Sequence, residues 1–173
     1  MDKSSRNQGI FICGPHPSRS IAAKESEPLH PVLHAYTDGA AGPTNPGPAA
    51  SAWIIMDPAS REVLVEDAVY IGRRTNNMAE YTAIIEALRD CRAHGKGKVR
   101  VHSDSQLCIN QINGSWRVNK PFLGVMVAEV RRLGAIFEDA NFVWVPRENA
   151  WITRCDRNAA EVLASRRGGC GGP

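Results

Sequence analysis

The chain has 173 residues, 43% of them hydrophobic, which is enough for one globular domain and too little for two. Its formal net charge of +3 is compatible with a polyanionic partner but does not demonstrate one. The five cysteines form no CxxC pair and no Cys/His spacing, which argues against a zinc site or a disulfide framework and favours reduced thiols. No apolar run reaches the roughly 18 residues of a membrane span, and none resembles a signal-peptide core. We therefore expect a soluble, cytoplasmic protein.

The two ends of the sequence differ from its middle. Residues 1–31 mix Ser, Pro, charged and isolated apolar residues without periodicity, which predicts a disordered N-terminal extension. Residues 167–173 have the glycine content of a flexible tail. The sequence thus predicts one domain over residues 32–166.

The first three predicted elements are strands. A strand-like run over residues 32–37 ends at Asp38 and Gly39, and a Gly- and Pro-rich loop leads to a second strand over residues 50–56. After a turn, residues 62 to about 71 alternate partially between apolar and polar. Short connections between these runs favour an antiparallel meander.

The second half of the domain has helical spacing. Apolar residues recur every three or four positions from residue 76 to about 94, and Gly95 follows as a stop signal. The remaining expected elements are a strand over 98–102, helices over 106–112 and 121–133, a strand over 142–145 and a helix over 155–165. This order predicts an α/β fold with a mixed five-stranded sheet, three antiparallel strands followed by two parallel ones, and helices on both faces.

Three acidic residues fall at meaningful places in this scheme. Asp38 follows the first strand, Asp104 follows the fourth, and Glu80 lies one turn into the longest helix. Alone, each is an ordinary turn residue or solvated charge. If the first and fourth strands are parallel neighbours, however, the carboxylates converge and need cations to offset their repulsion. Magnesium, which prefers carboxylate and water oxygens, fits such a cluster.

The residues around these acids carry a family resemblance. The blocks Thr37–Ala40, Thr75–Tyr81 and Ser103–Leu107 resemble, in this order, those of the type 1 ribonuclease H family, and the similarity covers nearly all of residues 32–165. The chain most resembles the small bacterial and archaeal branch without the basic protrusion, because only residues 115–120 join the two helices at that place. The resemblance implies a ribonuclease H-like fold.

The same resemblance implies an activity and its cofactors. It implies hydrolysis of the RNA strand of an RNA/DNA hybrid, leaving 5′-phosphate and 3′-hydroxyl ends, with two Mg²⁺ ions or Mn²⁺ as a substitute. The implied metal and catalytic residues are Asp38, Glu80, Asp104 and Asp156. Asp156 requires an insertion relative to the family pattern, and we expect it in the first turn of the closing helix. Asn149 and Asn158 remain alternatives for this fourth position.

Several residues resemble the family's substrate contacts. Asparagine and glutamine amides both donate and accept hydrogen bonds, which suits contacts with hydroxyls and base edges in the minor groove. We expect Asn76 to bind substrate, to cap the helix, or both. Trp116 is a candidate for the DNA strand, whereas Trp144, in a strand, is expected to be core. The predicted substrate-binding residues are Asn45, Asn76, Asn77, Gln106, Arg73, Arg74 and Trp116, with the two arginines near backbone phosphates.

Some alternatives remain open at this point. The family's flexible-loop histidine has no counterpart between Pro146 and Asp156, where Arg147, Glu148, Arg154 or no residue would take its place. The chain could also be a hybrid-binding module without catalysis, or another nuclease of the same superfold. We expect a monomer by default.

Overall fold

The computed structural model describes residues 32–95 and 97–168. Its elements are β1 (Val32–Ala41), β2 (Gly47–Asp57), β3 (Glu62–Arg74), α1 (Asn76–Ala93), β4 (Lys98–Ser103), α2 (Gln106–Ile112), α3 (Pro121–Gly134), β5 (Asp139–Trp144) and α4 (Ala150–Gly168). The predictions for residues 1–31 and 169–173 lie outside the described residues. Helix α4 continues past residue 166, where we expected the domain to end.

The five strands form one mixed sheet in the order β3-β2-β1-β4-β5. β1 pairs antiparallel with β2, and β2 pairs antiparallel with β3. β1 pairs in parallel with β4, and β4 with β5. The predicted architecture is therefore confirmed, including the parallel β1–β4 pair that brings the ends of those two strands together.

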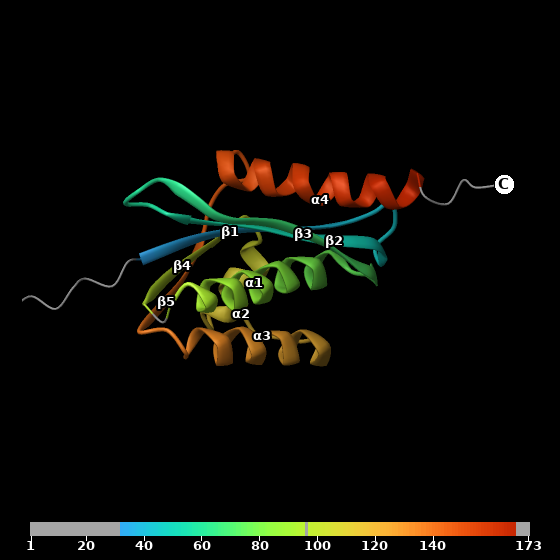
Figure 1. Cartoon of the computed structure of the whole chain (residues 1–173). Helices are drawn as coiled ribbons and strands as arrows, with labels where there is room; N and C mark the ends of the chain where they lie inside the picture. The colour runs from blue at the N-terminus through green and yellow to red at the C-terminus, as the bar shows by residue number, and fades with distance from the viewer. Residues whose placement is uncertain (1–31, 96, 169–173) are drawn as a thin grey trace, which may run out of the picture.

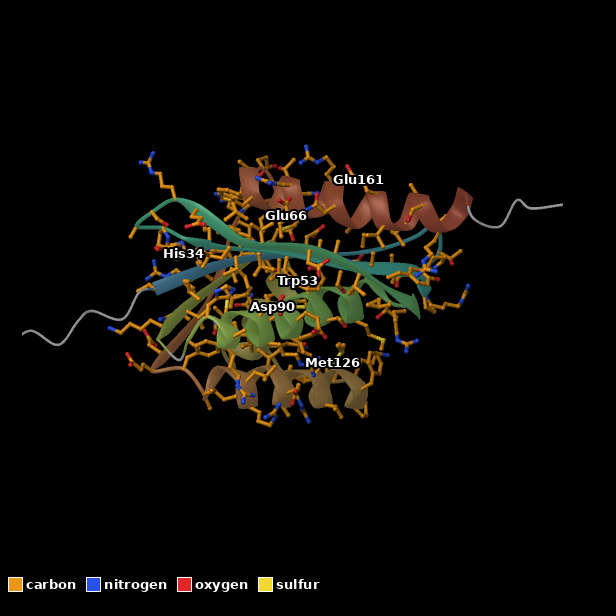
Figure 2. All side chains as sticks on the ribbon, viewed as in Figure 1. His34, Trp53, Glu66, Asp90, Met126 and Glu161 are labelled. Carbon is orange, nitrogen blue, oxygen red and sulfur yellow. The ribbon has the colours of Figure 1, made fainter. Side chains whose placement is uncertain are left out.

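Helices cover both faces of this sheet (Figure 1). α4 lies along one face, and α1 lies against the other with α2 and α3 beside it. The domain has two hydrophobic cores, one on each face of the sheet. Side chains of β2 point alternately to the two faces, so Trp53 and Ile55 pack on the α1 side while Ile54 and Met56 pack against α4. On the α1 side, Trp53 donates a hydrogen bond from Nε1 to the Asp90 carboxylate at 2.7 Å, and Figure 2 shows the two labelled residues between β2 and α1.

The closing helix starts earlier than its sequence pattern predicts. α4 begins at Ala150, five residues before the expected start. Asn149 explains the new boundary, because its Oδ1 accepts hydrogen bonds from the backbone N–H groups of Trp151 and Ile152. Ile152 and Cys155 are then fully buried against the sheet. Tertiary burial thus overrides the low helix propensity of the aromatic and β-branched residues here.

No helix in the described part of the chain has both the length and the apolar character needed to cross a bilayer.

Candidate active site

The parallel pairing of β1 and β4 brings two of the predicted acids together. Thr37 and Ser103 are register partners in this pair, so Asp38 and Asp104 follow side by side. The Thr37 hydroxyl donates to the His102 carbonyl at 3.3 Å, an additional link between the strands. β1 itself continues to Ala41, so Asp38 lies within the strand rather than after it as predicted. This position buries Asp38, which is 5% exposed.

A close contact between β1 and α1 adds Glu80 to the pair. A Cβ atom on Gly39 would lie 2.2 Å from the Glu80 backbone nitrogen, so only glycine permits this approach. From the neighbouring strand, the Ser51 hydroxyl donates to the Ala79 carbonyl at 2.7 Å. The first turn of α1 is therefore held against the sheet, and Glu80 is only 5% exposed.

The three carboxylates converge. Asp38, Glu80 and Asp104 each offer an oxygen atom, and these atoms lie within 4.8 Å of one another. Burial, reinforced by the charges of Asp104 and Asp156, raises the pKa of Asp38 to about 7. Burial raises the pKa of Glu80 well above its usual range, with the charges of Asp38 and Asp104 adding to the effect. The pKa of Asp104 is also raised, mainly by burial.

This donor set suits a hard divalent cation. One buried oxygen of Glu80, Oε2, has no hydrogen-bond partner, and an unsatisfied buried carboxylate oxygen is costly. A cation at this place would satisfy that oxygen and neutralise the repulsion that raises all three pKa values. The residues present therefore fit a magnesium or manganese ion, both of which accept carboxylate oxygens.

Asp156 approaches this cluster from α4. Its charge contributes to the raised pKa values of Asp38 and Asp104, although it is not one of the three converging carboxylates. Because α4 starts at Ala150, Asp156 lies in the second turn, so the expected first-turn position was wrong. Asn149 and Asn158, the alternatives for the fourth position, both have structural contacts, since Asn149 caps α4 and Asn158 donates to Glu66 at 2.9 Å.

One arginine faces the acids. The Arg147 guanidinium forms an ion pair with Asp156 at 3.0 Å, and its charge lowers the pKa values of Asp38, Glu80 and Asp104 against the effect of burial. Arg154, by contrast, is bound to Glu66 on β3, with one hydrogen bond at 2.7 Å. Of these two arginines, Arg147 is therefore the one placed to act on the carboxylate cluster.

Asn45 and Asn76 form a chain of hydrogen bonds that leads to Glu80. The Asn76 backbone N–H donates to Asn45 Oδ1 at 3.0 Å, and Asn76 Oδ1 accepts from the Ala41 backbone at 3.2 Å. Asn76 Nδ2 donates to Glu80 Oε1 at 3.5 Å. The expectation that Asn76 caps α1 was wrong, because Thr75 is the cap and its hydroxyl accepts from the Met78 backbone. Asn76 instead joins the β1–β2 loop to the acid cluster.

The other predicted substrate residues lie around this edge of the sheet or on its connections. Asn77 is half-buried in the first turn of α1, and Gln106 is exposed at the first position of α2, two residues after Asp104. Arg73 and Arg74 are exposed at the end of β3, opposite the start of β2. Trp116 is 48% exposed in the connection between α2 and α3.

Sequence reasoning missed the placement of Trp144 and the role of Gly39. Trp144, expected in the core, is 44% exposed, and its indole N–H donates to the Asp104 carbonyl at 3.1 Å. That contact spans 40 positions, so no local pattern indicates it. For Gly39 a signal was present, since the smallest residue directly follows an acid in a strand that packs under a helix.

Comparison with known proteins identifies the family to which this fold and carboxylate cluster belong. Residues 36–165 match the family model described as reverse transcriptase-like. The chain is 39% identical over 131 residues to ribonuclease HI of Halobacterium salinarum, covering 76% of this chain and 64% of that protein. It is 35% identical over 121 residues to the bifunctional protein Rv2228c of Mycobacterium tuberculosis, covering 69% of this chain and 33% of that protein. The chain thus spans less than two thirds of the length of these curated relatives.

Solved structures match over nearly their whole length. The crystal structure of the Halobacterium ribonuclease H1 has a TM-score of 0.71 at 37% identity, covering 78% of this chain and 98% of that one. The N-terminal ribonuclease H domain of Rv2228c has a TM-score of 0.74 at 31% identity, with coverages of 82% and 99%. LC11-RNase H1, solved in complex with an RNA/DNA hybrid, has a TM-score of 0.71 at 35% identity, with coverages of 78% and 99%. With the carboxylate cluster and the mixed sheet, these matches establish that the chain belongs to the type 1 ribonuclease H family.

Proposed function

We propose that this protein is an endoribonuclease that hydrolyses the RNA strand of RNA/DNA hybrids and leaves 5′-phosphate and 3′-hydroxyl ends. The observation that carries the proposal is the convergence of the Asp38, Glu80 and Asp104 carboxylates within 4.8 Å. The resolved complex of LC11-RNase H1 with an RNA/DNA hybrid supports the substrate class.

In this proposal, Asp38, Glu80 and Asp104 would hold two divalent cations, and Asp156, which pairs with Arg147 in this structure, would be the fourth carboxylate of the set. When bound, such cations supply activation of the attacking water and stabilisation of charge on the phosphate. Asp38, which is as deeply buried as Glu80 at 5% exposed, would help to hold both cations. Glu80 is oriented by Asn76 toward the side of the substrate that carries the 2′-hydroxyl group.

The substrate contacts are part of the same proposal. Asn77 lies in the first turn of α1, three residues before Glu80, and Gln106 begins α2, two residues after Asp104. In this proposal their amides bind minor-groove hydroxyls and base edges. Asn45, which also supports the start of α1, lies in the adjacent loop. Arg73 and Arg74 bind backbone phosphates, and Trp116 stacks against the DNA strand. Asn76 acts chiefly by positioning Glu80.

Further expectations belong with this proposal. The cations are Mg²⁺, with Mn²⁺ as a substitute, the protein acts as a monomer, and it works in the cytoplasm. The cysteines among the described residues, Cys91, Cys108 and Cys155, are buried and form no disulfide there, which supports a reducing compartment. We also propose that residues 32–168 form the catalytic domain and that both terminal segments lie outside it.

The test uses labelled RNA/DNA, RNA/RNA and DNA/DNA duplexes incubated with Mg²⁺ or Mn²⁺. We expect cleavage of the RNA strand in the hybrid, with ends that carry 5′-phosphate, and loss of cleavage in Asp104→Asn. The exposed β3 carboxylate variant Asp67→Asn is a matched control for the loss of one negative charge. Hybrid binding without cleavage would identify a non-catalytic binding module, and cleavage confined to DNA/DNA would identify another nuclease of the same superfold.

A further inference from the structure

Trp144 stands out because it is a large aromatic residue that the core does not bury. It is the last residue of β5 and the register partner of Ser103, at the end of the sheet where the acids converge. Its side chain is 44% exposed, so burial of apolar surface accounts for only part of its placement. Its one polar atom is satisfied, because Nε1–H donates to the Asp104 backbone carbonyl at 3.1 Å.

The Asp104 turn depends on backbone contacts. In the described part of the chain, no side chain donates a hydrogen bond to the Asp104 carboxylate, so the place of that carboxylate follows from the conformation of residues 103–105. Two bonds hold the Ser103 side of the turn, where the Ser105 backbone donates to Ser103 Oγ at 3.1 Å and the Val145 backbone donates to the Ser103 carbonyl at 3.0 Å. The Trp144 indole holds the carbonyl of Asp104 itself.

The backbone of β5, which carries the Trp144 side chain, is held by a neighbouring strand and a neighbouring helix. β5 pairs along its whole length with β4, and Asn113, the C-cap of α2, donates to the Phe142 carbonyl at 3.1 Å. β5 is therefore bound both to β4, which leads into the Asp104 turn, and to the C-terminal end of α2, the helix that follows the turn. A donor on this support can restrict the turn more than a contact from a free loop would.

We propose that Trp144 is a positioning residue for the metal site, which holds the Asp104 carboxylate in its cation-binding place through the indole N–H bond to the Asp104 carbonyl. The inference rests on the proposed function, because it assumes that Asp104 binds a divalent cation. Positioning and purely structural roles can be told apart by the property that a substitution changes. Substitution of a purely structural residue lowers stability alone, whereas substitution of a positioning residue lowers cation affinity in the folded protein.

The first experiment measures Mn²⁺ affinity by isothermal titration calorimetry, without substrate, in the full-length protein. Trp144→Phe keeps an aromatic ring and removes the N–H donor, and Trp116→Phe makes the same change at a site of similar exposure, 48%, away from the Asp104 turn. We expect Trp144→Phe to bind Mn²⁺ about three- to tenfold more weakly, the range of one hydrogen bond, and Trp116→Phe to match the parent. Thermal unfolding followed by circular dichroism confirms that both variants are folded.

Two results would overturn the inference. One is a Trp144→Phe affinity within twofold of the parent, and the other is an equal loss in both variants, which would reflect a general effect of removing an indole. If the parent protein binds no Mn²⁺, the proposed function itself fails. If the parent binds Mn²⁺ and Trp144→Phe binds it equally well, only the role of Trp144 is lost.

A second measurement needs no variant and covers the case in which Trp144→Phe does not fold. In the ¹⁵N-labelled parent protein, the assigned indole N–H signals are followed during a Mg²⁺ titration. The Trp144 signal should shift with the same concentration dependence as the Asp104 backbone amide, and the Trp116 signal should stay in place. A Trp144 signal that is unaffected at saturating Mg²⁺ would contradict the inference.

Discussion

At the scale of single residues, Asp38 and Glu80 place negative charge where the protein excludes water. Both are 5% exposed, and burial is the main cause of their raised pKa values. The charge of Asp104 raises the pKa of both residues further, and the charge of Asp38 also raises that of Glu80. Gathering these carboxylates lowers the stability of the fold, because each charge loses hydration and is repelled by its neighbours. A function that requires the clustered carboxylates, such as cation binding, explains why the protein retains them.

This cost predicts a pH-dependent effect of Asp38→Asn. The pKa of Asp38 is about 7 in the native state and 3.8 as its ordinary value. Between these values the native state binds more protons than the unfolded chain, so the free energy of unfolding falls as the pH rises from about 4 to about 7. With EDTA present, Asp38→Asn should raise the free energy of unfolding in urea by about 2 kcal/mol at pH 8 and by little at pH 4.5.

The control for this measurement is Asp67→Asn, which removes a charge from an exposed site on β3. It should leave the free energy of unfolding within about 0.5 kcal/mol of the parent at both pH values. An Asp38→Asn effect of equal size at pH 4.5 and pH 8 would show that the charge on Asp38 is not its source.

Asn76 and Asn77 are neighbours on α1 with different expected roles. The Asn76 side chain bonds to the Ala41 backbone and to Glu80, whereas the Asn77 side chain has no hydrogen bond within the described part of the chain. Asn76→Ala should lower kcat about tenfold with little change in KM, because it frees the Glu80 carboxylate. Asn77→Ala should mainly raise KM, because it removes a substrate contact. Steady-state cleavage of a labelled hybrid measures kcat and KM for both variants. A KM effect in Asn76→Ala and a kcat effect in Asn77→Ala would show that the two roles were assigned the wrong way round.

At the scale of elements, the approach of α1 to β1 decides whether the site forms. Gly39 permits this approach, because an added Cβ would meet the backbone of Ala79 and Glu80, with the nearest atom at 2.2 Å. Backbone atoms cannot move aside as a flexible side chain can. A substitution at Gly39 must therefore shift the start of α1, and Glu80 with it.

Gly39→Ala should lower the free energy of unfolding by about 3 kcal/mol and reduce hybrid cleavage strongly. Gly42→Ala is a matched control in the same region, since a Cβ on Gly42 would meet no atom within 4 Å. Urea unfolding and initial cleavage rates test both variants. Near-parental stability and activity of Gly39→Ala would show that β1 and α1 can separate without harm to the site.

The boundaries of the elements were predictable where local signals agreed with packing. α2 occupies residues 106–112 as predicted, because Ser105 caps it and its apolar spacing is regular. α4 was predicted too short, because the signal for its start is the Asn149 cap and the reason for its first turn is burial of Ile152 against the sheet. Such burial depends on strands that are distant in the sequence, which local periodicity does not report.

At the scale of the whole molecule, the sheet order made the main site predictable from sequence. Asp38, Glu80 and Asp104 each lie within a short recognisable block, and the parallel pairing of β1 with β4 follows from the order of strands and helices. The contacts of Trp144 with Asp104 and of Arg147 with Asp156 were not predictable. They depend on where β5 ends and on which face of α4 meets the sheet, so they require the assembled fold.

The stability of the whole domain should respond to the divalent cation at this site. A cation that binds only the native state raises the free energy of unfolding, by about 1.4 kcal/mol when its concentration is about ten times its dissociation constant. At pH 8, Mg²⁺ should therefore raise the midpoint of thermal unfolding above that found at equal ionic strength in NaCl. At pH 5 the increase should be smaller, because burial and repulsion raise the pKa values of Asp38 and Glu80 and protons compete with the cation. Asp104→Asn should remove most of the increase at pH 8, while Asp67→Asn should retain it. An equal increase in both variants would place the bound cation elsewhere on the protein, and the carboxylate cluster would then need another explanation.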